Sequence, residues 1–280
     1  MHYQFTGIGR KTEFSPNHVE SDSLILQHTA HHLQLLGADV NLLDESELTP
    51  ESIRSDLVFS MVQGPTGTEI LKTITQARDI LVINSPDSVC NCYRIHLVKK
   101  LKEHGIPFPR SVIGSTEETA IDESIETHFP YSKIWVKRGD VHAVHDEDVS
   151  LTSNESERRM ILNAFRRRGI RQVVFQEHLE GNTVKFYAVR GTAFFHWYYL
   201  HELYPIAFSV ETLQELASLS AKILGLDIYG GDAVIQTDGA IKIIDINDWP
   251  SFAPVRDAAG REIARFIYNK AEEYNHERKT

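Results

Sequence analysis

The sequence predicts an α/β protein with an amino-terminal parallel-sheet domain, followed by a domain made of α+β lobes. Three observations support this prediction. Strand-like and helix-like segments alternate over residues 1–88, an order typical of parallel sheets. Residues 110–175 have the mixed pattern of a smaller α+β lobe, and residues 232–247 have the pattern of a hairpin. The 280 residues, of which 41% are hydrophobic, can form two domains with sizeable cores, and we expect the boundary between 1–88 and 89–280.

Composition and charge exclude several classes of protein. The formal net charge of −10 argues against a general nucleic-acid binder. No apolar run approaches about 18 residues, so no membrane span is expected, and the first residues lack the apolar region of a secretory signal. Cys90 and Cys92 are too close for an ordinary disulfide, and we interpret them as reduced thiols of a cytoplasmic protein.

The elements of the amino-terminal domain follow from hydrophobic periodicity and from its interruptions. The expected helices are 22–36, which ends before Gly37, and 69–77, and the expected strands are 38–43, 56–61 and 79–83. Residues 64–68 form a glycine-bearing loop after a strand, a frequent place for a ligand. This loop lacks the Lys-Ser/Thr ending of a phosphate-binding P-loop, and a plain connection is an equally good interpretation.

Three histidines lie on the first expected helix. His28, His31 and His32 have helical spacing that suits a metal, but no carboxylate partner is evident in the sequence. A solvated or partly packed helix face is therefore the expected role of these side chains.

The second domain, residues 89–280, divides into a small lobe at about 110–175 and a larger lobe at about 176–280. Expected helices are 88–104, 155–168, 212–224 and 261–274, and expected strands are 134–137, 172–176, 184–189 and 194–199. The first helix ends at Gly105 and cannot resume across Pro107 and Pro109.

A hairpin at the end of this domain brings acidic side chains together. Asp238-Gly239 separates two apolar strands, 232–237 and 240–247, and a two-residue turn places Asp232 opposite Asp245. Asn247 lies on the same face as Asp245 because strand side chains repeat with period two. Facing carboxylates destabilise a sheet unless a cation binds them, and an all-oxygen set suits Mg²⁺ or Mn²⁺. The alternative is an exposed hairpin whose acids are solvated.

Residues 245–252, DINDWPSF, resemble the metal-binding end of the ATP-grasp fold, an acid-x-Asn-x-x-Pro pattern, and Asp232 occupies the place of that fold's other metal acid. A second similarity is the order of three segments: a strand that ends in Asn-Ser, a helix that carries a basic residue, and the sequence Gly-Ile-Pro-x-Pro. The resemblance covers roughly residues 84–255. It implies two lobes that enclose ATP.

The resemblance assigns roles to further residues. Arg94 and Lys137 would contact phosphates, and Gln176 and Glu177 would form the hinge whose backbone reads adenine and whose acid takes a ribose hydroxyl. Lys185 matches a basic position of the family. Arg256, expected in a loop after the metal residues, would face an anionic substrate.

The chain also departs from the family. The loop at 138–147 holds one glycine instead of several, and it resembles the histidine-containing loop of inositol trisphosphate kinases. His142 could therefore contact phosphate, although a surface histidine is an equal alternative. Thr183 stands where peptide-bond-forming members often have aspartate, and the usual second arginine is missing near Tyr198 and Tyr199.

These resemblances imply an ATP- and Mg²⁺-dependent ligase that joins a carboxylate to an amine through an acyl phosphate. The alternatives are a small-molecule kinase of the inositol phosphate type and a nucleotide-binding protein without catalysis. The expected partners are ATP and an anionic small molecule or peptide. Self-association of the chain is left open.

Overall fold

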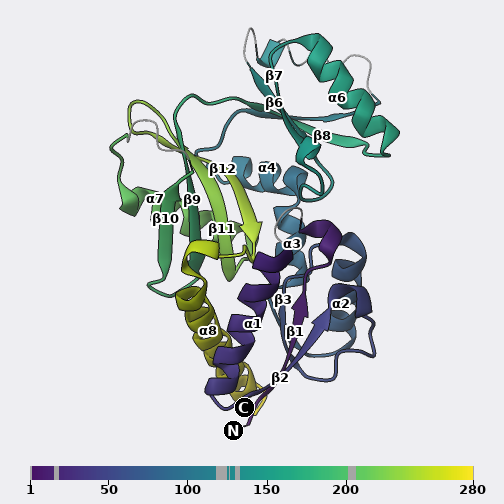
Figure 1. Cartoon of the computed structure of the whole chain (residues 1–280), viewed down its shortest axis with the longest axis vertical. Coiled ribbons are helices and arrows are strands. Elements are labelled where there is room, and N and C mark those ends of the chain that lie inside the picture. Colours follow the sequence, from purple (N-terminus) through teal and green to yellow (C-terminus); the bar gives the residue numbers. More distant parts are fainter. Residues whose placement is uncertain are drawn as a thin grey trace.

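The computed structural model describes residues 2–15, 19–117, 125, 127–129, 133–200 and 206–279. Its strands form three four-stranded sheets, one in the amino-terminal domain and two in the lobes that follow (Figure 1). The amino-terminal sheet lies at one end of the molecule and the small lobe at the other (Figure 1). The predicted mixed α/β fold class is confirmed.

The amino-terminal sheet is parallel, as predicted, with the order β2-β1-β3-β4. Its strands are β1 (Gln4–Gly9), β2 (Asp39–Asp44), β3 (Leu57–Ser60) and β4 (Leu81–Ile83), and its helices are α1 (Val19–Leu35) and α2 (Pro65–Ala77). The sequence interpretation missed β1, which is a central strand. The expectation of a loop at 64–68 was wrong, because Pro65 occupies the first position of α2, where its fixed φ favours a helix.

The single helix expected over 88–104 is two helices, α3 (Pro86–Cys92) and α4 (Arg94–Glu103). Tyr93 separates them with an extended backbone (φ −59°, ψ 132°). The buried Tyr93 hydroxyl donates a hydrogen bond to the Gln63 carbonyl oxygen at 2.9 Å, and this contact anchors the break to the amino-terminal domain.

The small-lobe sheet is antiparallel, with the order β5-β8-β6-β7. It contains β5 (Ser111–Ser115), β6 (Ile134–Arg138), β7 (Val149–Thr152) and β8 (Gln172–Glu177), and α6 (Glu155–Arg167) packs against it. Apolar residues of α6 and of the sheet share one core, so this lobe has its own hydrophobic centre.

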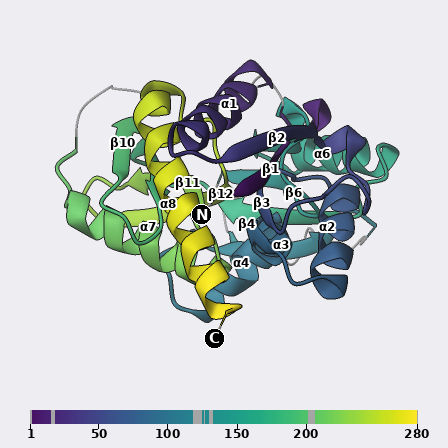
Figure 2. The same cartoon turned by 90° about the horizontal axis from the view of Figure 1, so that it is seen from below.

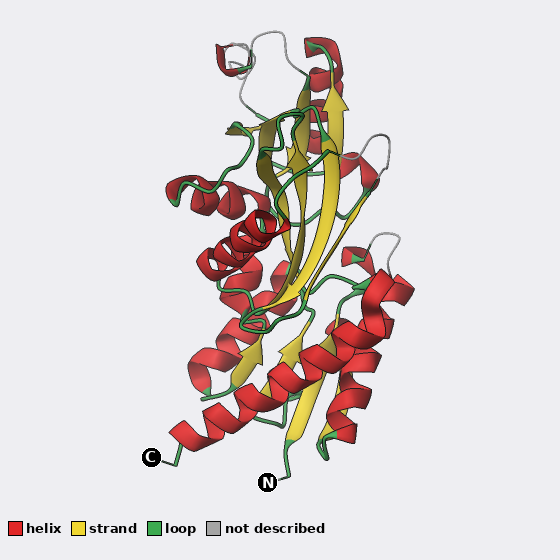
Figure 3. Cartoon of the chain, turned by 90° about the vertical axis from the view of Figure 1, so that its left-hand side faces the viewer, coloured by secondary structure: helices red, strands yellow, loops and turns green. Residues whose placement is uncertain are grey.

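The larger lobe contains an antiparallel sheet with the order β10-β9-β11-β12. Its elements are β9 (Asn182–Val189), β10 (Phe195–Tyr199), α7 (Val210–Leu224), β11 (Ile228–Ile235), β12 (Ile241–Asp248) and α8 (Arg256–Glu277). Helix α7 covers this sheet, whereas α8 packs along α1 and contacts β4 and β9, at the boundary with the amino-terminal domain (Figures 2 and 3).

A buried asparagine joins the end of β4 to the start of β11. The Asn84 side chain donates to the Ile228 carbonyl oxygen at 2.7 Å and accepts from the amides of Asp227 and Ile228 at 2.9 Å. These bonds satisfy backbone groups at the start of β11. The position of the larger lobe is thereby tied to the end of β4.

The hairpin between β11 and β12 departs from the predicted turn but keeps the predicted pairing of acids. Ile235 pairs with Ile241, so the loop has three residues between Gln236 and Ala240, and only Gly239 has positive φ, at 83°. A bulge after Asp232 then shifts the register by one residue. Asp232 therefore does pair with Asp245, as predicted.

Candidate active site

The centre of the candidate site is the pair of facing carboxylates on β11 and β12. Asp232 pairs directly with Asp245, and Gly231 lets the two strands approach closely. A Cβ atom at Gly231 would lie 2.4 Å from the Asp245 carbonyl oxygen and 2.7 Å from Phe186 Cζ. Side chains of Asp232 and Asp245 are 18% and 21% exposed, so both carboxylates are largely shielded from solvent.

Cations from neighbouring elements lie against these carboxylates. Lys185 pairs with Asp232 across β9 and β11, with its Nζ atom 2.8 Å from Oδ1 and 3.1 Å from Oδ2. Arg94, at the start of α4, places Nη2 3.7 Å from Asp245 Oδ2. Burial raises the pKa of Asp232 against the opposing effect of Lys185. Burial also acts to raise the pKa of Asp245, but Arg94 and other nearby cations hold it below its usual value.

The donor set fits a hard divalent cation. Carboxylate and carboxamide oxygens are the ligands that Mg²⁺ prefers, and facing carboxylates repel each other unless positive charge lies between or beside them. Asp232 Oδ1 is buried and accepts no well-aligned hydrogen bond from the described residues, although Lys185 lies close to it. Asn247 lies two residues after Asp245, and these two residues line one cavity.

One cavity of about 210 Å³ lies between the small lobe and the carboxylates. Its walls include four predicted nucleotide residues together with the two acids: Arg94, Lys137, Gln176, Glu177, Asp232 and Asp245. Lys137 is only 6% exposed, and its Nζ atom donates to Gln176 Oε1 at 2.5 Å. Burial, with the nearby Arg94, lowers the pKa of Lys137 to about 7. Glu177 accepts hydrogen bonds from the Arg110 amide and guanidinium at 3.3 and 3.2 Å.

A second cavity, of about 550 Å³, lies between the larger lobe and the amino-terminal domain. It is lined by Lys185, Asn247, His142 and Tyr198 from the second domain, and by Arg10, Asp22 and Gln63 from the first. Arg94, Val149 and Asp245 line both cavities, so the two meet beside the acidic pair. Arg94 Nε is buried and has no hydrogen-bond partner among the described residues, which leaves a donor at this junction.

No family model matches the chain, and no curated protein matches its sequence. Solved structures do match over nearly the whole chain. A D-alanine–D-alanine ligase from Bacillus anthracis has a TM-score of 0.73 at 12% identity, with 98% of this chain and 99% of that chain covered. The VanG D-Ala:D-Ser ligase from Enterococcus faecalis has a TM-score of 0.74 at 16% identity, with 98% and 100% covered.

A third solved structure that matches is an ATP-grasp protein. The RimK domain protein ATP-grasp from Sphaerobacter thermophilus has a TM-score of 0.71 at 16% identity, and 95% of this chain and 99% of that chain are covered. This chain has the ATP-grasp fold. At these identities the similarity establishes the architecture, whereas the chemistry has to be argued from the site residues.

The glycine-poor loop at 138–147 is anchored in the structure. Val141 is buried in an apolar cluster with Val89 and Tyr93. His142 is 8% exposed, with Nε2 3.1 Å from Oδ1 of the fully buried Asp248. Apolar packing therefore holds this loop, and the alternative of a surface histidine at position 142 was wrong.

Asp148 holds the end of the same loop. Its carboxylate accepts from the Val144 amide at 2.8 Å and the His145 amide at 3.1 Å, and it lies 2.6 Å from Arg168 Nη2. Burial acts to raise the pKa of Asp148, but these hydrogen bonds and Arg168 bring it below its usual value.

One predicted residue lies elsewhere. Arg256 is the first residue of α8 and not part of a loop, and it is not among the residues that line either cavity. Its Nε atom is buried and has no hydrogen-bond partner among the described residues. The other predicted site residues all line one or both cavities.

Several residues in the second cavity were not predicted. Arg10 is fully engaged: Nη1 donates to Asp22 at 2.8 Å, Nε to the Met61 carbonyl oxygen at 3.2 Å, and Nη2 to the Trp249 carbonyl oxygen at 3.0 Å. The Gln63 side chain donates to Asp248 Oδ1 at 2.8 Å. Arg10 and Gln63 follow β1 and β3 at the carboxyl ends of parallel strands, so a prediction of β1 would have indicated Arg10.

The turn after β12 has an unusual backbone. Trp249 and Phe252 have positive φ values of 33° and 49°, a conformation that costs energy for residues other than glycine. Both side chains are fully buried, and the Trp249 ring stacks on Phe59 with centroids 6.0 Å apart. Burial of these rings holds the turn in a conformation that directs the chain from the acids into α8.

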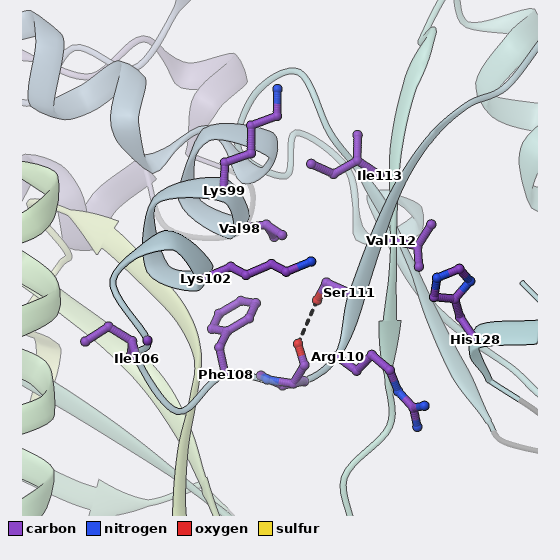
Figure 4. A pocket seen from close by; sticks show the side chains of 12 residues that line it. Val98, Lys99, Lys102, Ile106, Phe108, Arg110, Ser111, Val112, Ile113 and His128 are labelled. Carbon is purple, nitrogen blue, oxygen red and sulfur yellow. Dashed lines mark hydrogen bonds between the residues drawn. The ribbon is translucent and has the colours of Figure 1, made fainter. Parts of the chain in front are cut away.

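A further cavity, of about 660 Å³, lies between α4 and β5 (Figure 4). Lys99 and Lys102 extend from α4, and Val112 and Ile113 lie on the facing strand (Figure 4). None of the predicted site residues lines it. Arg110, on its wall, connects it to the nucleotide side through the ion pair with Glu177. This cavity shares no lining residue with the two that meet beside the acidic pair.

Proposed function

We propose that this protein is an ATP- and Mg²⁺-dependent ligase that joins a carboxylate to an amine. The observation that carries the proposal is the junction of two cavities at Asp245 and Arg94. One cavity has the predicted nucleotide residues and the other has polar side chains from both domains. A phosphoryl group at the junction would lie within reach of ligands in both.

The nucleotide would lie between the lobes. Glu177 would accept from a ribose hydroxyl in place of its bond with Arg110, and Lys137 would turn from Gln176 toward phosphate oxygens. Arg94 would use its unpaired donor on the terminal phosphate. The cavity of about 210 Å³ is smaller than the roughly 300–1,000 Å³ typical of ligand pockets, so we expect the lobes to separate when the nucleotide binds.

The metal would be held by Asp232, Asp245 and Asn247. When bound, Mg²⁺ would neutralise charge on the phosphate oxygens and fix their position. Lys185, which contacts Asp232 and lines the second cavity, would supply positive charge for the substrate carboxylate.

The reaction would have two steps. A carboxylate oxygen of the substrate attacks the γ-phosphorus, the bond from γ-phosphorus to the β–γ bridging oxygen breaks, and ADP leaves. An amine nitrogen then attacks the acyl carbon, inorganic phosphate leaves with the carbon–oxygen electron pair, and the nitrogen loses a proton. Positioning and charge neutralisation are what the side chains contribute, because phosphoryl transfer needs little covalent help from a protein.

The second cavity supports an anionic acceptor of small size. Its positive groups near the junction are Lys185 and Arg94, whereas Arg10 is fully engaged in structural bonds. His142 lines this cavity with Nε2 3.1 Å from Asp248 Oδ1, so a kinase of the inositol phosphate type, which would direct a loop histidine at phosphate, is the second candidate function. A kinase, and a nucleotide-binding protein without turnover, become outcomes of the product test that closes the Discussion.

Location and assembly remain predictions. Cys90 and Cys92 are free thiols, consistent with the predicted cytoplasmic location. No helix in the described ranges is long and apolar enough to cross a membrane.

Calorimetric titration of an ATP analogue with Mg²⁺ tests the nucleotide and metal site. Asp245→Asn should bind the Mg²⁺ form more weakly than the wild type, because one anionic metal ligand becomes neutral. Asp238→Asn is the matched control, since Asp238 lies exposed at the hairpin tip and its bond from the Ala240 amide can be kept by asparagine. Equal Mg²⁺-dependence of binding in Asp245→Asn and wild type would contradict the proposed metal site.

A further inference from the structure

We infer that His28, His32 and Asp257 form a second metal site, separate from the acidic pair, that binds a transition-metal dication such as Zn²⁺. Their potential ligand atoms all lie within 4.8 Å of one another. The sequence showed the two histidines one helical turn apart on α1 but offered no carboxylate. The fold supplies one from the first turn of α8.

The distances suit zinc coordination. His32 Nε2 lies 3.4 Å and His28 Nδ1 lies 3.7 Å from the same oxygen, Asp257 Oδ1. Two ligands about 2.0–2.1 Å from a tetrahedral zinc are roughly 3.3–3.4 Å apart. Small side-chain rotations would therefore bring the three atoms around one ion, and water would complete an open four-coordinate shell.

The two helices that carry the ligands are held firmly against each other. Helices α1 and α8 share a core that includes Ile25, Ala259 and Ile263. Gly260 lies against His28, and a Cβ atom there would be 2.8 Å from His28 Cβ. Because close packing fixes the helix spacing at this point, the ligands are brought together before any ion binds, which lowers the entropic cost of binding.

A neighbouring arginine orients the carboxylate. Arg261 Nη2 donates to Asp257 Oδ2 at 2.9 Å and so leaves Oδ1 directed toward the histidines. Partners of this kind commonly fix the ligands of metal sites. The side chain of His32 is 13% exposed and that of Asp257 is 63% exposed, so an ion can enter from solvent while one ligand is shielded.

Binding would join the first and last long helices of the chain. Helix α1 also carries Asp22, which lines the second cavity and accepts hydrogen bonds from Arg10 and Ser15. A metal at His28, His32 and Asp257 would thus stabilise the helix pair that supports one wall of that cavity. An ion that binds only the folded state raises the melting temperature, and the rise increases with the free concentration of the ion.

The test uses the full-length protein after treatment with a chelator, without nucleotide. Zn²⁺ is titrated by calorimetry in wild type, Asp257→Asn, His32→Ala and the control His31→Ala, whose exposed side chain lies outside the cluster. The expected result is one zinc equivalent whose affinity falls about tenfold or more in Asp257→Asn and His32→Ala and stays unchanged in His31→Ala. The zinc-dependent rise in melting temperature should disappear in the same two variants.

Two further outcomes decide the case. Asp245→Asn should still bind one zinc equivalent, because Asp245 belongs to the other site. Loss of zinc binding in Asp245→Asn would assign the zinc to the acidic pair instead. Asp257→Asn is isosteric and exposed, so its folding is expected to be intact. Equal zinc affinity in Asp257→Asn and wild type, or absence of zinc binding to the wild type, would overturn the inference.

Discussion

Replacing Lys137 by methionine should remove a proton uptake that accompanies nucleotide binding. Lys137 is buried, and burial together with Arg94 lowers its pKa to about 7. Phosphate oxygens beside the ammonium group favour its charged form and should return the pKa toward its usual value near 10.5. The lysine that is partly neutral in the free protein should therefore be charged in the complex.

The size of the effect follows from the two pKa values. At pH 8, one unit above the free-protein value, about 0.9 of the lysine is neutral, so binding should take up about 0.9 proton. At pH 6 the uptake should fall to about 0.1. Loss of the charged contact should also weaken nucleotide binding by about 1.5–3 kcal/mol.

Calorimetric titration of ADP with Mg²⁺ at pH 8, in two buffers of different ionisation enthalpy, measures the protons directly. Lys133→Met is the matched control, because Lys133 is exposed on the same segment. Uptake should be present in wild type and Lys133→Met and absent in Lys137→Met. A wild type without uptake at pH 8, or uptake retained in Lys137→Met, would refute the role given to this lysine.

The same lysine links stability to pH in the free protein. Its folded pKa lies below its unfolded value, so the unfolded chain binds more protons between about pH 7 and 10.5. The contribution of Lys137 to the free energy of unfolding should rise with pH across that window. Denaturant titrations should show this rise in wild type and a smaller one in Lys137→Met.

Three further variants test the surroundings of the site. Gly231→Ala should destabilise the protein by about 1–3 kcal/mol, because its Cβ would overlap the Asp245 carbonyl oxygen. Gly9→Ala is the control and should cost less, since the nearest neighbour of its Cβ would be 3.4 Å away. Equal melting temperatures of the two variants would contradict the close packing at Gly231. His142→Ala should lower turnover more than ADP affinity, because His142 lines the second cavity and not the nucleotide cavity; a fully active variant would limit the loop to a connecting role. Asp148→Asn should lower the free energy of unfolding most above pH 3.8, because the pKa of Asp148 is depressed in the folded protein. The stability that this carboxylate contributes is lost as the pH falls from 3.8 through its folded-state pKa. A stability difference from wild type that is constant with pH would contradict this.

The pairing of Asp232 with Asp245 could be predicted because strand side chains alternate and the turn is short. The turn itself was mispredicted by one residue, and a bulge after Asp232 compensates for the error. A bulge of this kind depends on contacts with β9 and β12, which the local sequence does not report. The pairing was therefore right although part of the reasoning that led to it was wrong.

The residues missed by sequence reasoning depend on long-range packing. Strand β1 contains two glycines among its six residues, so its pattern is weak, and Arg10 was missed together with it. The break at Tyr93 is fixed by a hydrogen bond to Gln63, 30 residues away. The zinc-type cluster needs Asp257, more than 220 residues from His32 along the chain. Such contacts come from the fold, whereas residues on one hairpin or one strand can be grouped by periodicity.

The most direct test of the central proposal is the fate of oxygen and phosphate during turnover. Wild-type protein is supplied with ATP, Mg²⁺, amines and a panel of carboxylates whose carboxyl groups carry ¹⁸O. The ligase mechanism predicts that ADP and inorganic phosphate form only when carboxylate and amine are both present, and that this phosphate contains one ¹⁸O atom from the carboxylate. Phosphate left on a substrate hydroxyl, or inorganic phosphate free of carboxylate oxygen, would contradict it.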